Sequence, residues 1–329
     1  MNWTCLGLAA TLSLAAVSAD AADKVRFGTN WLAEAEHGGY YQAVADGTYA
    51  KYGLDVEIVQ GGPQAANALL LASGKLDFYM GSELIEAFDA LQQNVAMVVV
   101  AAHFQKDPQM VMSHPGVGLD KFQDLVNAPA FIAKVAPFYD WMVSAYGFKQ
   151  ENRKPYTFNP QPFIADKKSI QQGYITSEPY AVEKMGGFKP NIFLFADYGF
   201  STYATTVETR PDVIAKKGDL VQRFVDASAI GWYHYLYGDN KAANELIKKD
   251  NPEMTDDQIA FSIQKMKDYG IVDSGDTLTK GIGAMNDEKV KDFYDKMVKA
   301  GVEPANLDYK KVYTLQFVNK GVGLDQKPK

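Results

Sequence analysis

Two kinds of apolar segment alternate along the first part of the chain, and this alternation limits the fold more than any other feature. Val25 and Phe27 alternate with charged neighbours and predict a strand, and residues 54–62 alternate in the same way. Residues 37–53 have the length and the final glycine of a helix. Residues 95–104 form a continuous apolar run, which is typical of a strand buried on both faces. Strands that alternate with helices predict a doubly wound α/β domain.

The rest of the chain adds a second α/β unit and a mostly helical C-terminal part. Strand-like and helix-like segments alternate again over residues 111–204. Residues 219–249, 255–269 and 287–301 carry apolar side chains three and four positions apart, which predicts helices. With 329 residues, of which 47% are hydrophobic, the chain has room for about two domains with real cores.

The first residues predict an export signal over residues 1–22. The apolar stretch at 6–17 is too short to span a bilayer, and Ala19 and Ala21 give a cleavage site of small residues. Cys5 is the one cysteine of the chain and lies within this signal. Its removal leaves no cysteine for a disulfide, a thiolate metal site or a nucleophile. We therefore expect an exported, soluble protein.

Charge and motif content exclude several classes of function. The net charge is −7 and the pI about 5.2, so the surface repels nucleic acid, and no basic run suits anionic lipid. Motifs for a serine hydrolase, a zinc protease or a nucleotide loop do not occur. The four histidines lack metal-ligand spacing: His37, His103, His114 and His234. The sequence therefore predicts neither an enzyme nor a cofactor or metal site, and "HGG" at 37–39 is only a weak phosphate-loop signal.

Two loops are expected at the ligand-binding edge of the first unit, where the strands end. They are residues 29–39 and 81–83, within reach of each other in a doubly wound sheet. The first carries Trp31 and is followed by Tyr40 and Tyr41, whose flat faces can bury a ligand ring. Carboxylates there can accept hydrogen bonds from an amino-substituted heterocycle. These loops predict an aromatic, acidic binding pocket.

Structural roles compete with binding roles for each of these residues. Trp31 can be a core residue, and adjacent helical tyrosines cannot both face a pocket, so one is expected in the core. Ser82 is expected to cap a helix at 83–94, which would give Glu83 a role at the positive end of the helix dipole. Glu178 and His37 fit either role, and Lys134 fits a solvated loop.

The run "NWLAEAEHGGYYQAVADGTYAKYGLDVEIVQGGPQAANALLLASGKLDF" resembles the start of a known family. This family comprises the periplasmic substrate-binding proteins of ABC importers, in the group that includes binders of thiamine pyrimidine precursors, sulfonates and nitrate. "QQGYITSEPY" resembles the glycine, short strand and Glu-Pro segment of that family. "DYGFSTYATTVETRPDVI" resembles its return through the hinge and the start of a long helix. The resemblance covers nearly the whole chain after the signal.

The resemblance implies a type II periplasmic-binding-protein fold, with two α/β lobes that close on a ligand. Lobe 1 would comprise residues 24–110 plus 205–329, and lobe 2 residues 111–204. The protein would act in the periplasm as a monomer, bind a small molecule and deliver it to an ABC permease in the inner membrane. The implied ligand-binding residues are Trp31, His37, Tyr40 and Ser82 of lobe 1, Lys134, Phe163 and Glu178 of lobe 2, and Tyr203 near the hinge.

The ligand that best suits the sequence is a small, flat nitrogen heterocycle similar to the thiamine pyrimidine precursor. Glu34 and Glu36 lie in the first loop, which has no lysine or arginine for a sulfonate or nitrate. Backbone amides at helix starts could still hold such an anion, and riboflavin would use the same aromatic and acidic groups. An iron-dependent pyrimidine-synthase relative is disfavoured because its cysteine-rich motif is missing. A sensor-domain protein that presents ligand to a receptor would have the same fold.

Overall fold

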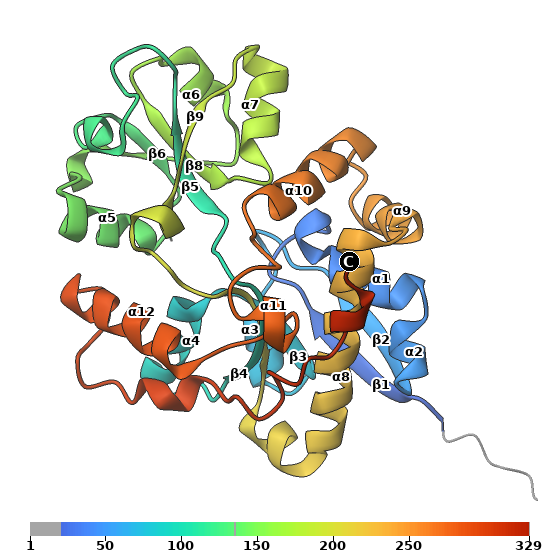
Figure 1. Ribbon diagram of the computed structural model, residues 1–329. Coiled ribbons are helices and arrows are strands. Elements are labelled where there is room, and N and C mark those ends of the chain that lie inside the picture. Colours follow the sequence, from blue (N-terminus) through green and yellow to red (C-terminus); the bar gives the residue numbers. More distant parts are fainter. Residues whose placement is uncertain (1–20, 135, 329) are drawn as a thin grey trace, which may run out of the picture.

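The computed structural model describes residues 21–134 and 136–328, so the predicted signal lies almost wholly outside the described residues. Two lobes, each built on a mixed β-sheet, make up the described chain (Figure 1). The strands of the first sheet, in spatial order, are β2 (Leu54–Val59), β1 (Asp23–Gly28), β3 (Phe78–Glu83), β10 (Ala204–Thr209) and β4 (Val98–Phe104). Those of the second sheet are β7 (Arg153–Pro155), β6 (Ala130–Ile132), β8 (Ile170–Tyr174), β5 (Gln109–Ser113) and β9 (Asn191–Leu194). The predicted α/β class is thus confirmed.

A strand that returns late in the chain completes the first sheet. β1 pairs in parallel with β2 and β3, whereas β10 lies between β3 and β4 and is antiparallel to both. β5 has the equivalent position in the second sheet, antiparallel to β8 and β9. β10 is separated from β4 by the whole second sheet in the sequence, so the two lobes cannot be consecutive halves of the chain.

Helices cover both sheets and account for most of the C-terminal third. The α-helices of the described residues are α1 (Gly38–Ala45), α2 (Thr48–Lys51), α3 (Asn67–Ala72), α4 (Leu84–Gln92), α5 (Phe138–Tyr146), α6 (Gln161–Ala165), α7 (Glu178–Gly186), α8 (Pro211–Tyr237), α9 (Lys241–Asp250), α10 (Asp256–Asp268), α11 (Thr277–Lys280) and α12 (Asp287–Lys299). Short 3₁₀ turns are η1 (Ala35–His37), η2 (Phe122–Leu125), η3 (Gln150–Asn152), η4 (Phe195–Tyr198), η5 (Tyr309–Val312) and η6 (Leu324–Gln326). Within the described ranges, no helix is both long and apolar enough to cross a membrane.

Two predicted helices are each divided into two. The helix expected over 37–53 is interrupted at Gly47, whose φ of 72° is left-handed, and the Asp46 carboxylate accepts hydrogen bonds from the Thr48 amide and hydroxyl. The helix expected over 219–249 ends at Tyr237, and a new helix begins at Lys241. In both cases the apolar period continues across the break, so periodicity alone does not reveal it.

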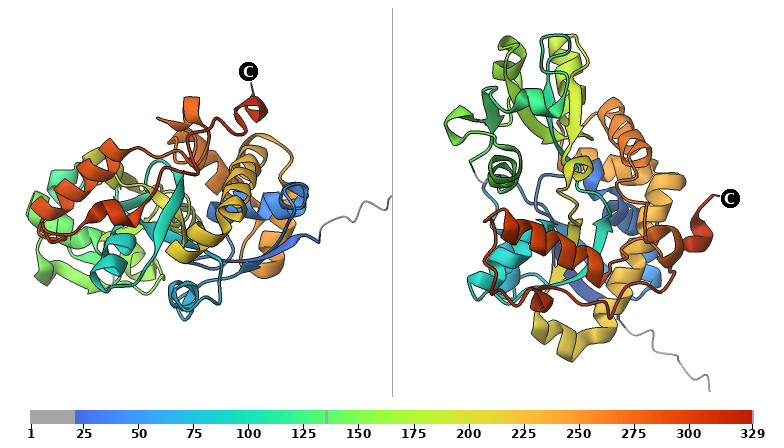
Figure 2. Two further views of the ribbon diagram at one scale, coloured as in Figure 1. Left: turned by 90° about the horizontal axis from the view of Figure 1, so that it is seen from below. Right: turned by 60° about the vertical axis from the view of Figure 1, so that its left-hand side comes forward.

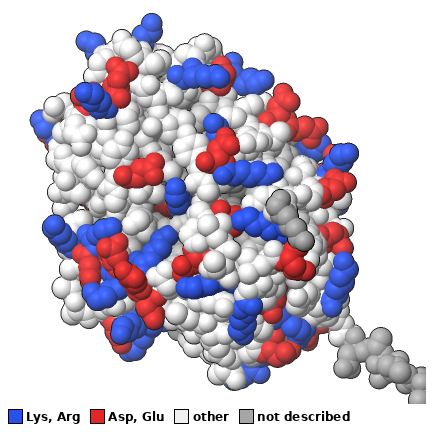
Figure 3. Space-filling view, in the orientation of Figure 1, with Lys and Arg blue, Asp and Glu red and all other residues white. Residues whose placement is uncertain are grey.

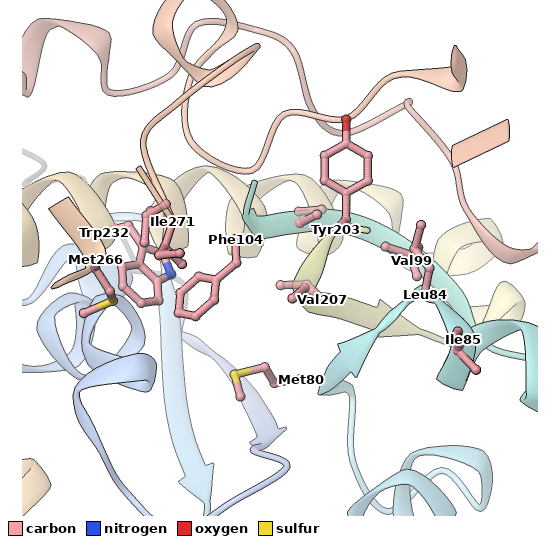
Figure 4. Packing of buried hydrophobic residues seen from close by; sticks show 14 of the residues in the cluster. Met80, Leu84, Ile85, Val99, Phe104, Tyr203, Val207, Trp232, Met266 and Ile271 are labelled. Carbon is pink, nitrogen blue, oxygen red and sulfur yellow. The ribbon is translucent and has the colours of Figure 1, made fainter. Parts of the chain in front are cut away.

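The core of the first lobe depends on a close approach between α1 and α8. A Cβ on Gly39 would lie 2.2 Å from Cγ of the buried Trp232 ring, and one on Gly38 would lie 2.0 Å from the Tyr235 ring. Trp232 also packs edge-on against Phe104 of β4. Val207 of β10 lies next to Phe104 (Figure 4). The glycines that suggested a phosphate loop therefore serve helix packing.

Two short passages connect the lobes, at residues 105–108 and 199–203. Lys289 of α12 contacts both passages, since its ammonium donates to the Gln105 carbonyl and lies 4.2 Å from the centre of the Tyr203 ring. The right-hand view of Figure 2 shows the lobes one above the other, with α10 beside the upper one. There Ser262 of α10 donates a 2.7 Å hydrogen bond to the Thr176 carbonyl of the second lobe.

The α1–α8 contact predicts an asymmetric response to alanine substitution. Gly39→Ala should destabilise the protein by about 1–3 kcal/mol, because the buried Trp232 ring must move. Gly218→Ala, next to the kink of α8 at Lys217, is the control and should change stability by less than about 0.5 kcal/mol, since its Cβ would meet no atom within 4 Å. Urea unfolding followed by circular dichroism measures both. Equal effects would contradict the packing role of Gly39.

Candidate functional site

A cavity of about 640 Å³ lies between the two lobes. Its wall comes from the carboxyl ends of β1 and β3 and the segments after them, from the start of β10, and from the ends of β6 and β8 with the segments that follow. Ligands bind at this edge in open α/β sheets. The wall includes Trp31, Glu34, Glu36, His37, Ser82, Glu83, Glu86, Asp89, Gln109, Ala133, Ala136, Phe158, Gly173, Tyr174, Glu178 and Thr205.

Backbone contacts hold the Trp31 loop in place. The Gly61 amide donates to the Trp31 carbonyl at 3.1 Å and to the Thr29 hydroxyl at 3.0 Å. A Cβ on Gly61 would lie 2.3 Å from the Thr29 carbonyl oxygen, so only glycine permits this approach. The buried Asn67 amide donates to the same Thr29 oxygen at 2.8 Å. The loop that carries Trp31 is thus tied to the segment after β2.

An aromatic contact joins the lobes beside the cavity. The rings of Trp31 in the first lobe and Phe158 in the second are 4.9 Å apart, and Tyr156 lies 5.3 Å beyond Phe158. Phe158 is 51% exposed and has a left-handed φ of 62°, while Thr205 on the cavity wall has a φ of 47°. Such backbone strain in non-glycine residues concentrates at functional sites. The two strained residues therefore support a functional role for this cavity.

Glu178 is held at the cavity wall because its side chain turns back toward the end of β8, four residues earlier in the chain. Its carboxylate accepts a 2.7 Å hydrogen bond from the Tyr174 amide at the end of β8, and the Tyr156 hydroxyl donates to it at 3.4 Å. A Cβ on Gly173 would lie 2.6 Å from Glu178 Cβ, so glycine at this position makes room for the acid. The segment "GYITSE" thus builds a carboxylate site from local contacts.

Glu34, Glu36 and Glu178 form an acidic group, and the first two residues lie just before a buried histidine, His37. His37 is fully buried, and its Nε2 lies 3.8 Å from Glu34 Oε1, too far for a hydrogen bond. Burial raises the pKa of Glu36 and raises that of Glu178 to about 7. Burial and the charges of Glu36 and Glu178 hold the pKa of Glu34 well above its usual value. Burial lowers the pKa of His37 to about 3, so this histidine stays neutral.

A second acidic group surrounds the start of α4. Glu83 is buried, and burial together with the Asp107 charge raises its pKa well above the usual value. Gln109 lies between them, with its amide nitrogen 3.1 Å from Asp107 Oδ2 and 3.5 Å from Glu83 Oε2. The Glu86 carboxylate accepts from the Ser82 amide at 2.9 Å. Ser82 does not cap α4 as predicted, since β3 extends to Glu83, which is itself the N-cap residue.

The structure places four of the eight predicted site residues on the cavity wall: Trp31, His37, Ser82 and Glu178. Tyr40 is the clearest correction. Its ring is fully buried against Phe27, and its hydroxyl shares a 2.8 Å hydrogen bond with His103 Nδ1. Tyr41 is buried too and donates to Asp250, so both tyrosines pack inside the first lobe. Helices α8 and α9 enclose this face of α1, which local sequence does not reveal.

The other three predicted residues lie off the wall for different reasons. Phe163 is fully buried against His114 on the far part of the second lobe. Lys134 is exposed, although its neighbours Ala133 and Ala136 line the cavity. Tyr203 sits in the second passage between the lobes, where its hydroxyl accepts a 3.1 Å hydrogen bond from the Asn286 amide and points away from the core (Figure 4).

Sequence reasoning also missed wall residues. Phe158 belongs to an extended, aromatic-rich segment, but its contact with Trp31 arises only when the lobes meet. Gly173 precedes Glu178 by five positions, and that spacing was the available signal that the Glu178 side chain turns back. Glu34 and Glu36 stood out as charges, whereas their burial depends on the second lobe and α10.

The wall differs in charge from the outer surface. Lysine and arginine side chains alternate with acidic ones on the face shown in Figure 3. The cavity wall carries six carboxyl groups and no lysine or arginine; the six are Glu34, Glu36, Glu83, Glu86, Asp89 and Glu178. In the part of the chain that the structure describes, no three His, Cys, Asp or Glu side chains could hold a metal ion together. The cavity therefore suits nitrogen donors better than anions.

The raised pKa of Glu178 predicts that replacing this residue with glutamine changes the stability of the protein by an amount that depends on pH. The folded protein holds this proton up to pH of about 7, whereas an unfolded glutamate loses it near pH 4.3, so stability from this group falls as pH rises between these values. Glu178→Gln should raise stability of the unliganded protein by about 1–3 kcal/mol more at pH 8 than at pH 5. Thermal unfolding at both pH values measures this, with the exposed Glu151→Gln as control. An equal shift at both pH values would contradict it.

Comparisons with known proteins place the chain in a family. The NMT1/THI5-like family matches residues 34–243, and no curated protein sequence matches. Three solved structures resemble the chain. The periplasmic aliphatic sulphonate binding protein SsuA of Escherichia coli has 12% identity and a TM-score of 0.66, over 88% of this chain and 91% of that one. The Candida albicans CA3427 gene product, which exhibits the generic periplasmic binding protein fold, has 15% identity and a TM-score of 0.62, over 90% of this chain and 97% of that one. The desulfurization enzyme DSZB has 11% identity and a TM-score of 0.58, over 91% of this chain and 98% of that one. The resemblance and the predicted fold are confirmed, and the chain belongs to the NMT1/THI5-like family.

Proposed function

We propose that this protein is a periplasmic solute-binding protein that captures a small, flat nitrogen heterocycle and delivers it to an ABC permease. The observation that carries the proposal is the cavity between the lobes, whose wall combines aromatic rings with carboxyl groups from both sides. Trp31 and Phe158 offer ring faces, and Glu36 and Glu178 offer hydrogen-bond acceptors for amino groups. An aminopyrimidine similar to the thiamine precursor has a flat ring to pack against the aromatic faces and amino hydrogens to donate to the carboxyl groups.

Lobe closure is the proposed mechanism, with the protein acting as a monomer. Residues 24–110 plus 205–329 would move as one lobe and residues 111–204 as the other, around the passages at 105–108 and 199–203. Ligand would favour the closed state because each lobe supplies part of the site, so the ligand binds that state more tightly. The Trp31–Phe158 contact and the Ser262–Thr176 hydrogen bond would form on closure.

An anionic ligand fits this cavity less well. No lysine or arginine lines the wall, and two backbone amides of the wall that could replace them already donate to carboxylates. The Ser82 amide donates to Glu86 and the Tyr174 amide donates to Glu178. The sulphonate in the name of the Escherichia coli protein belongs to that protein, whose 12% identity to this chain concerns the fold.

Binding also fits the cavity better than catalysis, although an enzyme shares the fold. Nucleophilic catalysis needs a serine, cysteine or similar group hydrogen-bonded to a base. His37 is the histidine on the wall, and neither of its ring nitrogens has a hydrogen-bond partner among the described residues. The wall thus offers recognition groups without an activated nucleophile.

A thermal-shift screen tests the proposal. The panel comprises 4-amino-5-hydroxymethyl-2-methylpyrimidine, riboflavin, an alkanesulfonate and nitrate at millimolar concentration. The aminopyrimidine should raise the melting temperature by about 3–8 °C at a hundredfold excess over Kd, because ligand binds the folded state only. If the melting temperature rises only with riboflavin or only with the anions, the ligand belongs to that class and the aminopyrimidine proposal is wrong. No shift with any member would refute solute binding from this group.

The aromatic contact between the lobes gives a second test. Phe158→Ala should weaken binding of the heterocycle about 3–10-fold, mainly through faster dissociation, because the closed state loses a contact worth about 0.5–1.5 kcal/mol. Met185→Ala is the matched control, since Met185 is also 51% exposed on the second lobe but lies off the cavity wall. Stopped-flow fluorescence with Trp31 as reporter follows both. An unchanged dissociation rate in Phe158→Ala would contradict a role of Phe158 in lobe closure.

A further inference from the structure

The acidic group at the cavity contains polar atoms that the protein does not satisfy. Glu36 is 3% exposed and lies on the cavity wall, where the Thr176 hydroxyl lowers its pKa but no donor of the described residues is within hydrogen-bond distance of its Oε1. Both ring nitrogens of the fully buried His37 also have no hydrogen-bond partner among the described residues. Buried polar atoms without partners are costly and rare in native proteins. The Glu36 oxygen and one ring nitrogen of the neutral His37 call for hydrogen-bond donors, and the other ring nitrogen, which carries the proton, calls for an acceptor. These unpartnered atoms point to a ligand with polar groups, donors among them.

Among the described residues, no lysine or arginine lies on the cavity wall beside this group. The titratable side chains around Glu36 are Glu34 and His37 on its own turn, Tyr174, Glu178 and Tyr156 from the second lobe, and Tyr235 from α8. The neighbouring cations are engaged elsewhere. Arg153 donates to the Ala133 carbonyl and lies over the Tyr139 ring, and Lys265 of α10 lies over the Phe261 ring. A buried carboxyl group stays protonated or acquires a paired charge, and a cationic ligand could supply that charge here.

We propose that the ligand binds as a cation, through an amidinium-type fork of two N–H donors that contacts Glu36 of the first lobe and Glu178 of the second. A protonated aminopyrimidine has such a fork, formed by its ring N–H and exocyclic amine, and so does an amidine. The inference rests on the proposed solute-binding function and adds the charge of the ligand. It also gives closure a cause, since a cation between the lobes allows both groups to ionise without mutual repulsion and so favours the closed state.

The proton balance of binding follows from the acidic group. Burial raises the pKa of Glu178 to about 7, so in the empty cavity at neutral pH this carboxyl is partly protonated, and burial also raises the pKa of Glu34 and Glu36. A ligand that arrives as a cation displaces a carboxyl proton, which passes to the solvent, and an ion pair forms. A ligand that arrives as a neutral base takes the same proton and forms the same ion pair, without release to solvent. Proton release therefore reports the charge state of the ligand that enters.

The test uses three probes with one ring and different charge: benzamidine, benzamide and benzoate. Isothermal titration of the full mature protein at pH 7 in phosphate and in Tris buffer gives affinity and proton release together. Benzamidine should bind at least about tenfold more tightly than benzamide, as expected for a charge-assisted hydrogen bond, and should release a proton. Benzoate should not bind. Tighter binding of benzamide or benzoate than benzamidine would overturn the inference.

Variants assign the charge to the named residues. Glu36→Gln and Glu178→Gln should each weaken the binding of benzamidine at least about tenfold and reduce proton release. The affinity for benzamide should change less than about threefold. Glu151→Gln removes the same charge from an exposed position and should change neither. Melting temperatures of the unliganded variants show that they fold. Equal losses for benzamidine and benzamide would overturn the assignment.

The outcome separates this inference from the proposed function. A neutral heterocycle that binds where benzamidine fails leaves solute binding intact and overturns the cationic ligand. Failure of benzamidine and of every heterocycle in the thermal-shift panel overturns both. Binding of benzamidine with proton release, lost in Glu36→Gln and Glu178→Gln, supports both.

Discussion

The burial of carboxyl groups without protein cations is the constraint on which the site depends. Moving an ionised carboxylate out of water is so costly that such groups stay protonated or acquire a paired charge. Glu36 and Glu178 remain near the cavity at this cost, held by η1 and by the start of α7. A protein that needed only stability would replace them with apolar side chains. Their retention on a cavity wall is what a binding function explains.

The rest of the architecture serves to bring these acids together. Glu36 follows β1 of the first sheet and Glu178 follows β8 of the second, so neither lobe alone forms the site. The insertion of β10 between β3 and β4 makes the chain pass between the lobes twice, which leaves two narrow connections. Lys289 contacts both connections from α12, so the C-terminal helices belong to the hinge region as well as to the first lobe.

Rigid and strained contacts occur at different places in this arrangement. The Trp31 loop is tied to the segment after β2 by Gly61 and Asn67, and α1 is packed tightly against α8. By contrast, Phe158 is half exposed and adopts a left-handed backbone where it meets Trp31. Strain stored beside a cavity can be released by a change of conformation, whereas tight glycine contacts resist one. A fixed wall on one lobe and a strained contact from the other suit a cleft that closes.

The sequence by itself determined the α/β class, most strands, the family and the acidic character of the first loop, because these follow from local periodicity and composition. It also placed Trp31, His37 and Glu178 in segments that follow predicted strands, and these residues lie on the cavity wall. Only the tertiary structure decided that Tyr40 is core, that Phe158 reaches the cavity and that Glu36 is buried. The physical reason is that burial is set by contacts between segments far apart in sequence: α8 covers Tyr40, and the second lobe meets the loop of Glu36.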